Sequence, residues 1–268
     1  MKTRLATAML ALFVTLTAAR IATAQDVPNK QAVLSQATQS YYSLRNEGLA
    51  SFQCSITPNW ESLLAEERKS NPAAIDAAIR VLSQLRFTVN VRPDQTATVT
   101  HNEVPAQNPE MQQGLRQIYG GMEQMTEGFF DTWKLFVFDH PFPAVNSDYR
   151  LEEADSTYRL TYKEDAANVV TVMGKDFAIK SLSVTTSQFD SGIRPSFIQT
   201  AKRTWLLNKY SAVYENGHKE QTTVLDMAMD YQTVNGFNLP RNLALSGSYG
   251  GTPFAVELTF SDCTAQRK

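Results

Sequence analysis

Apolar and polar residues alternate through the C-terminal quarter of the chain, residues 204–262. A period of two with one apolar face is typical of antiparallel strands whose inner face covers an apolar core. Asn235-Gly236 and residues 250–253 supply turn signals between such strands. This quarter therefore predicts four consecutive strands. The apolar faces of two of them consist of Leu225, Met227, Met229 and Tyr231, and of Phe254, Val256, Leu258 and Phe260.

Short alternating segments earlier in the chain predict further strands. Most connections after residue 145 are short, so these strands are expected to be sequential antiparallel neighbours. One strand cannot stand alone, so we expect a single antiparallel sheet of about eight or more strands. The additional strands are predicted at residues 49–57, 87–91, 96–101, 149–153, 158–163, 168–173 and 177–185.

Helical patterns precede and interrupt these strands. Residues 28–47 are expected to form one helix, which ends at Gly48. Asn59 can cap a second helix, and Asn71 with Pro72 can start a third as its cap and first residue. The helices within residues 28–47 and 60–133 are all expected to lie on the concave side of the sheet.

The most unusual helical pattern is rich in methionine and glycine. Each interior glycine costs roughly 0.5–1 kcal/mol relative to alanine, so this helix is expected to be loose. Two interpretations remain open: ordinary core packing against the sheet, or a mobile lid over an apolar cavity, because thioethers adapt to varied partners. Its apolar positions recur every three or four residues and are Met111, Leu115, Ile118, Met122, Met125, Phe129 and Trp133.

The first 24 residues carry the pattern of a cleavable export signal. Lys2 and Arg4 precede an apolar run, and Ala22-Thr23-Ala24 fits the small-x-small cleavage rule. The run is short for a membrane span, and an N-terminal membrane anchor is the alternative. We expect a periplasmic location without a lipid anchor, because no cysteine lies at the cleavage point. Residues 25–268 are expected to form a single half-barrel domain with a helical insertion at about 59–143.

Charge and cysteine content narrow the classes of partner. The formal net charge is −2 with both signs scattered, which argues against nucleic acid and against a polybasic membrane contact. Cys54 and Cys263 would meet an oxidising compartment after export, and they lie near the first and last predicted strands. Cys54 shares the parity of the apolar residues in its strand, whereas Cys263 has the parity opposite to Phe260. A disulfide between them and two unrelated cysteines therefore both remain open.

The sequence shows no catalytic signature. The motifs of zinc proteases, serine hydrolases, P-loop proteins and dinucleotide-binding enzymes are missing from it. His101 and His218 each stand two residues before a glutamate, without a second ligand pair at helical spacing. His140, beside Asp139, is the best single candidate for a functional histidine. Residues 246–251 are interpreted as the turn between the last two strands. We therefore expect no enzyme, no cofactor and no metal site.

Two parts of the chain resemble a known family. A helix leads through a glycine into a strand, and the chain ends in an antiparallel meander with an Asn-Gly turn before its penultimate strand. This arrangement resembles the LolA/LolB-type periplasmic lipoprotein-carrier family of outer-membrane lipoprotein sorting. The residues that carry the resemblance are Tyr41-Tyr42-x-Leu44, Gly48-Leu49-Ala50-Ser51-Phe52 and Val234-Asn235-Gly236-Phe237-x-Leu239-Pro240.

The resemblance implies an α+β fold: a strongly curved antiparallel sheet, or unclosed β-barrel, with helices covering its concave apolar face. It also implies that acyl chains are held on that face. The leading hypothesis is thus a soluble carrier of a lipid or lipidated protein, which would meet a membrane-associated partner. The alternative is a periplasmic sensor or scaffold that binds a protein partner on the same fold. The ligand-binding residues we expect are Met111, Leu115, Met122, Met125, Phe129, Leu225, Met227, Met229, Phe254, Val256, Leu258 and Phe260.

Overall fold

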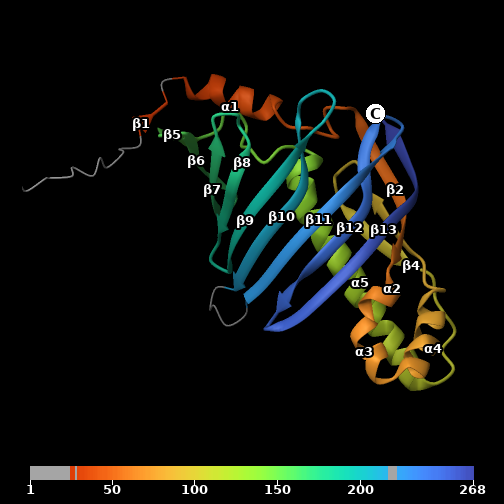
Figure 1. Cartoon of the computed structure of the whole chain (residues 1–268). Helices are drawn as coiled ribbons and strands as arrows, with labels where there is room; N and C mark the ends of the chain where they lie inside the picture. Colours follow the sequence, from red (N-terminus) through yellow and green to blue (C-terminus); the bar gives the residue numbers. More distant parts are fainter. Residues whose placement is uncertain (1–24, 28, 217–221) are drawn as a thin grey trace, which may run out of the picture.

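A computed structural model of the protein describes residues 25–27, 29–216 and 222–268, so the predicted export signal lies outside the described residues. In the described ranges, thirteen strands form one antiparallel sheet in the order β1-β5-β6-β7-β8-β9-β10-β11-β12-β13-β2-β3-β4 (Figure 1). The strands are β1 (Gln25–Asp26), β2 (Leu49–Pro58), β3 (Phe87–Val91), β4 (Ala97–His101), β5 (Tyr149–Ala154), β6 (Thr157–Glu164), β7 (Ala167–Gly174), β8 (Ile179–Thr185), β9 (Phe189–Gln199), β10 (Trp205–Asn216), β11 (Thr222–Val234), β12 (Phe237–Tyr249) and β13 (Thr252–Arg267).

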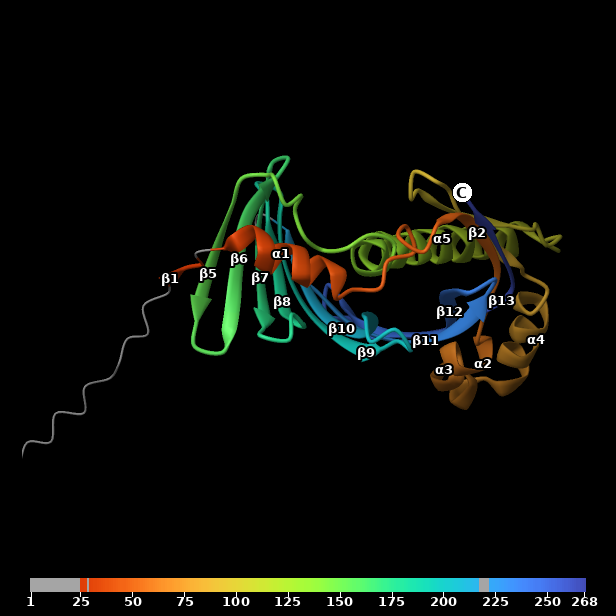
Figure 2. The same cartoon turned by 90° about the horizontal axis from the view of Figure 1, so that it is seen from above.

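The sheet curls strongly around a concave face but does not close (Figure 2). The short strand β1 forms one edge, beside β5, and β4 forms the other. This confirms the predicted fold class, an α+β protein with an unclosed antiparallel barrel. Residues 59–143, the expected helical insertion, also contain β3 and β4, which extend the same sheet.

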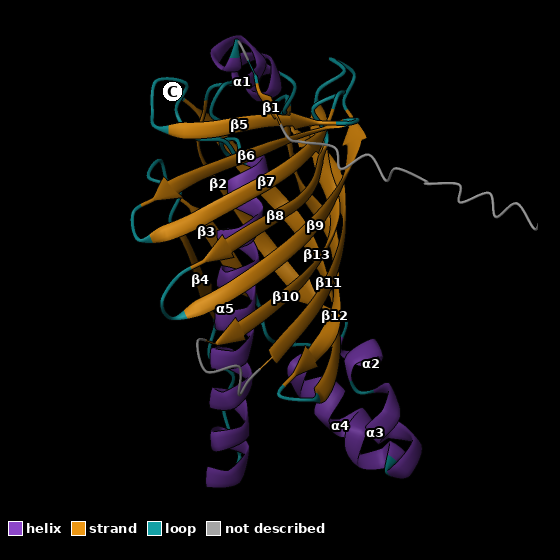
Figure 3. Ribbon diagram, turned by 90° about the vertical axis from the view of Figure 1, so that its left-hand side faces the viewer, coloured by secondary structure: helices purple, strands orange, loops and turns teal. Residues whose placement is uncertain are grey.

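The five helices of the described residues divide into three groups by position. α5 (Pro109–Val137) lies within the curve of the sheet, as predicted (Figure 2). α1 (Lys30–Gln39) crosses one end of the strands, near β5–β8 (Figures 1 and 3). None of the five combines the length and apolarity that a bilayer span needs. The third group is α2 (Trp60–Leu63), α3 (Ala65–Ser70) and α4 (Pro72–Leu82).

This third group corrects the prediction that every helix covers the concave face. α2, α3 and α4 lie at the opposite end of the strands from α1, beyond the concavity (Figure 1). Few of their residues are buried: none in α3, only Trp60 in α2 and only Leu82 in α4. Helices with so little buried surface cannot cover the inner face of a large sheet.

Two further boundaries differ from the prediction. The first helix ends at Gln39 instead of Glu47, because the next residues pair with β10: the Trp205 N–H donates to the Ser40 carbonyl at 2.7 Å. β9 is a strand that the pattern did not predict, since it contains Gly192 and Pro195, which weaken a strand assignment. β8 pairs with β9 only as far as Ile193, so the proline two residues later removes no hydrogen bond between these strands.

Contacts occupy part of both ends of the sheet, which limits strand addition by another chain there. At the first edge β1 pairs with β5, and Nζ of Lys30 donates to the Tyr149 carbonyl at 2.9 Å. At the other edge, the carboxylate of Glu127 on α5 accepts the Val99 N–H of β4 at 3.3 Å. α5 therefore covers an edge of the sheet as well as part of its concave face.

Candidate functional site

The predicted inward residues of β11 and β13 share one face of the sheet, as their alternation requires. Leu225 and Phe254 are half-buried and lie in one cross-strand row, with Gly247 of β12 between them. The other five are buried: Met227, Met229, Val256, Leu258 and Phe260. Most of the strand residues predicted to line an apolar cavity are thus buried in this structure.

The C-terminal half of α5 fills the middle of the concave face with aromatic side chains. Trp133 is 0% and Phe130 1% exposed. The Phe130 ring centroid lies 6.0 Å from those of both Phe52 on β2 and Phe260 on β13. Phe129, one of the expected ligand-binding residues, is also buried, with its centroid 6.5 Å from that of Phe260. Contacts of this kind are those of a hydrophobic core, so this half of the helix favours the core-packing interpretation.

The N-terminal half of α5 extends past the ends of the strands (Figure 3). Here Leu115 and Met122 are buried, whereas Met111 is only half-buried. Met125, just beyond the midpoint of the helix, is half-buried as well. A groove of about 340 Å³ separates this half of α5 from α4. All of the residues that line the groove are aliphatic or glycine: Ala77, Ala78, Val81, Leu82, Met111, Gly114, Leu115 and Ile118.

A second hollow, of about 730 Å³, lies between α5 and the segment that follows β4. Leu115 lines both the hollow and the groove, so the two are neighbours on the same part of the helix. The hollow has a polar character, because His101, Glu103, Arg116 and Glu123 all belong to its wall. The two cavities together place an aliphatic surface next to a charged one.

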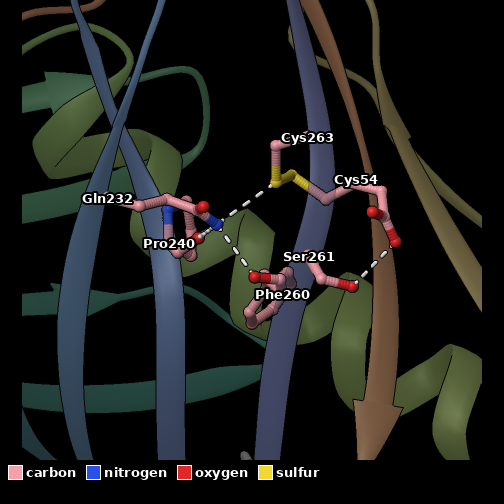
Figure 4. The surroundings of a disulfide bond; sticks show 7 residues. Cys54, Gln232, Pro240, Phe260, Ser261 and Cys263 are labelled. Carbon is pink, nitrogen blue, oxygen red and sulfur yellow. Dashed lines mark hydrogen bonds between the residues drawn. A yellow bond between two sulfur atoms is a disulfide. The ribbon is translucent and has the colours of Figure 1, made fainter.

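Cys54 and Cys263 form a disulfide between β2 and β13, with their Cα atoms 4.1 Å apart (Figure 4). Two residues of β13, Asp262 and Cys263, stand opposite the single residue Cys54 in the strand pairing. Asp262, with a φ of 49°, supplies the extra residue of this bulge. The bulge reverses the side-chain parity of β13 beyond Ser261, and this resolves the parity conflict that the sequence presents.

The side-chain amide of Gln232 ties neighbouring strands together beside the disulfide (Figure 4). Its Nε2 donates to the carbonyl of Pro240 at 2.8 Å and to that of Phe260 at 2.9 Å. The same nitrogen lies 3.4 Å from Sγ of Cys263. These contacts satisfy a half-buried amide within the sheet, so Gln232 is a structural residue here.

Several tyrosine hydroxyls are buried inside the half-barrel. The Tyr231 hydroxyl accepts the Nε1–H of Trp133 at 3.3 Å and donates to the Leu207 carbonyl. Burial raises the pKa of Tyr231 well above its usual value. Burial also raises the pKa of Tyr41, Tyr162 and Tyr210. These phenols stay neutral over the physiological pH range.

The residues considered as candidate catalytic or metal-binding groups do not come together in one site. Nε2 of His140 lies 3.7 Å from the carboxylate of Asp139, which also pairs with Arg45 at 3.0 Å. His218 lies outside the described residues. Within the described part of the chain, no group of three or more His, Cys, Asp or Glu side chains is placed to hold a metal ion. Residues 246–249, which the sequence assigns to a turn, belong to β12, and only residues 250–251 form the turn.

No protein-family model, curated protein or solved structure matches the chain. The resemblance to lipoprotein carriers stays a prediction, which rests on the sequence pattern. A fold alone does not define a ligand, so the functional argument depends on the geometry of the groove and the hollow beside α5.

Proposed function

We propose that the protein is an exported soluble binder or carrier of a hydrophobic chain, such as the acyl chain of a lipid or of a lipidated protein. The observation that carries this proposal is the aliphatic groove between α4 and α5. Its volume, about 340 Å³, lies within the range of small-ligand sites. Its walls present methyl and methylene groups, which suit an unbranched apolar chain better than a polar ligand.

The free energy of binding expected for such a groove suits a protein that both takes up and releases an acyl chain. Each methylene moved from water into the groove contributes about 0.8 kcal/mol. About ten buried methylenes would yield about 8 kcal/mol, which corresponds to a micromolar dissociation constant before the cost of ordering the chain is subtracted. A carrier has to release its ligand as well as bind it, and a moderate affinity allows both.

The proposed site is displaced from the one that the sequence predicts. The sequence predicts a cavity along β11 and β13, but the aromatic residues of α5 cover most of that face. Met111 and Leu115 are the predicted ligand-binding residues that line the groove itself. Through Met111, the methionine-rich helix would still provide the adaptable apolar surface that the sequence predicts.

A matched pair of variants on α4 tests the proposal. Ala78 lines the groove, whereas Ala73 lies on the same helix outside its lining. Ala78→Phe should fill the groove and weaken the binding of a fluorescent fatty acid by at least about tenfold, because displacing two methylenes already costs about 1.6 kcal/mol. Ala73→Phe adds the same ring elsewhere and should leave the affinity unchanged.

Each result has a distinct meaning. Equal affinities of the two variants would place the acyl chain outside the groove and contradict the site. No binding by the native protein, together with no lipid in mass spectra of the protein purified from the periplasm, would contradict the carrier function. That outcome would favour the alternative, a sensor or scaffold that uses the exposed apolar surface for a protein partner.

A further inference from the structure

One polar stripe of α5 faces the edge strand β4. Tyr119, Glu123 and Glu127 recur every four residues, so they lie on the same side of the helix. Each of them contacts β4 itself. The Tyr119 ring stacks on His101 with centroids 3.8 Å apart, Glu123 pairs with the same histidine, and Glu127 accepts the Val99 N–H.

His101 stands at the centre of these contacts, with an acceptor opposite each ring nitrogen. Nδ1 lies 3.0 Å from the backbone carbonyl of Asn102, and Nε2 lies 3.4 Å from a carboxylate oxygen of Glu123. A carbonyl and a carboxylate can only accept, so both contacts are favourable only when both nitrogens carry a proton. The neutral ring has one proton and leaves a lone pair facing an oxygen.

The other groups around His101 do not replace this pairing. From α5, Tyr119 packs on the face of the ring, and Arg116 and Glu123 line the same hollow. From the segment after β4, Glu103 lines that hollow as well. From β3, the ring of Phe87 packs at 6.2 Å and carries no charge. Glu123 is the carboxylate in contact with the imidazole.

We propose that His101 is a pH-sensitive latch that holds the N-terminal half of α5 on the edge strand β4. The protonated imidazole joins the helix to the strand through Glu123, and the neutral imidazole keeps only the ring stack and one hydrogen bond. The latch is therefore tighter when the imidazole carries both protons, at acidic pH, and looser when the imidazole is neutral, at alkaline pH. The same half of α5 forms one wall of the groove, so the latch sets how readily that wall moves, and this last step rests on the proposed function.

Hydrogen exchange measured by mass spectrometry tests the latch directly in the full chain. In the native protein, protection of residues 109–121, corrected for the intrinsic exchange rate, should fall about two- to fivefold between pH 5.5 and 8.5, as for a partly exposed ion pair. His101→Gln, which stays neutral, should show the lower protection at both pH values. His140→Gln is the matched control, because His140 also pairs with a carboxylate, that of Asp139, but lies beyond the other end of α5.

A second pair of variants separates the charge pair from a general effect on the helix. Glu123→Gln should remove most of the pH dependence, whereas Glu110→Gln, which neutralises a carboxylate in the first turn of the same helix, should keep it. A flat pH profile in the native protein, or a profile that survives in His101→Gln, would overturn the latch.

The fatty-acid titration then separates the two proposals. If the carrier function holds, the rate of fatty-acid uptake should rise with pH in the native protein and lose that dependence in His101→Gln. A pH-dependent exchange profile without fatty-acid binding would keep the latch and contradict the carrier. Fatty-acid binding with a flat exchange profile would support the carrier and overturn the latch.

Discussion

The hydroxyl of Tyr41 donates to the backbone carbonyl of Phe177 at 2.8 Å, and the same oxygen accepts the N–H of Ile179 at 2.8 Å. Phe177 has a φ of 64°, in the left-handed region that a bulky residue rarely adopts. Such a conformation costs about 1–3 kcal/mol and persists only where the surroundings hold it. Tyr41 thus fastens the segment after α1 to a strained turn at the start of β8.

Tyr41→Phe should lower the free energy of unfolding by about 1–3 kcal/mol, because it leaves a partly buried carbonyl and a buried N–H without their partner. Urea unfolding measures the change. In a Phe177→Gly background the strain is relieved, so the same substitution should cost less. Equal costs in both backgrounds would show that the tyrosine does not hold the strained turn.

Reduction of the disulfide between Cys54 and Cys263 should lower the stability by roughly 2–5 kcal/mol, since the bond closes a very long loop. The double variant Cys54→Ala with Cys263→Ala should show the same loss and no response to reductant. Thiol titration of the unreduced, denatured protein provides the direct check. Two reactive thiols per chain would contradict the bond.

Met122, near the middle of α5, and Met111, near its start, should respond differently to the loss of the methionine side chain. Met122 is 6% exposed, so Met122→Ala should cost about 2–5 kcal/mol through the cavity that it leaves. Met111 is half-buried at the groove, and Met111→Ala should cost less than about 1 kcal/mol. Chemical denaturation compares the two. Equal losses would mean that the helix is packed uniformly along its length.

Gly247 is required where β12 passes very close to β11. A Cβ added there would lie 1.9 Å from the backbone carbonyl oxygen of Val224. Gly247→Ala should therefore destabilise the protein by about 1–3 kcal/mol or more, because backbone must shift. Gly192, within β9, has open space at the same position, so Gly192→Ala should be neutral or stabilising. Thermal unfolding compares the two variants. Equal changes in melting temperature would contradict the requirement for glycine at residue 247.

The buried tyrosines should make the protein sensitive to alkali. Burial raises the pKa of Tyr41, Tyr162, Tyr210 and Tyr231 in the folded chain, whereas an unfolded tyrosine ionises near pH 10. Their contribution to stability is complete below about pH 10 and is lost above it, by up to about 1.4 kcal/mol per pH unit for each tyrosine. Urea midpoints and tyrosinate absorbance, followed together, should show these residues ionising only as the chain unfolds.

The sequence predicts the sheet well wherever a strand has one buried face. β11 and β13 follow the alternation because most of their inward positions are buried in the core. The pattern did not predict β9, because Pro195 is tolerated at a place where β8 has already stopped pairing with β9 while β10 still pairs, and only the register shows this. The parity of Cys263 is likewise decided by one inserted residue, Asp262, whose side chain carries no signal for a bulge.

The candidate site was harder to predict than the fold. The repeat of Met111 and Leu115 identifies an apolar stripe, but small residues such as Ala77 and Ala78 give no hint that they form the opposite wall. His101 resembles only a fragment of a metal motif in the sequence. Its actual partner, Glu123, comes from another element, and that pairing depends on how α5 lies against β4.

The sheet order has a consequence for how the chain assembles. β2 is among the first strands to be synthesised and β13 is the last, yet β13 lies between β12 and β2. Contacts between residues this distant in the sequence form late and slow the folding of a β-rich chain. The strands β2–β4, and α5 that covers them, cannot join the rest of the sheet until all sixteen residues of β13 are available. If the protein is exported through a translocation channel, as proposed, its chain would stay incompletely folded until β13 has been delivered, and an incompletely folded chain passes through such a channel more readily.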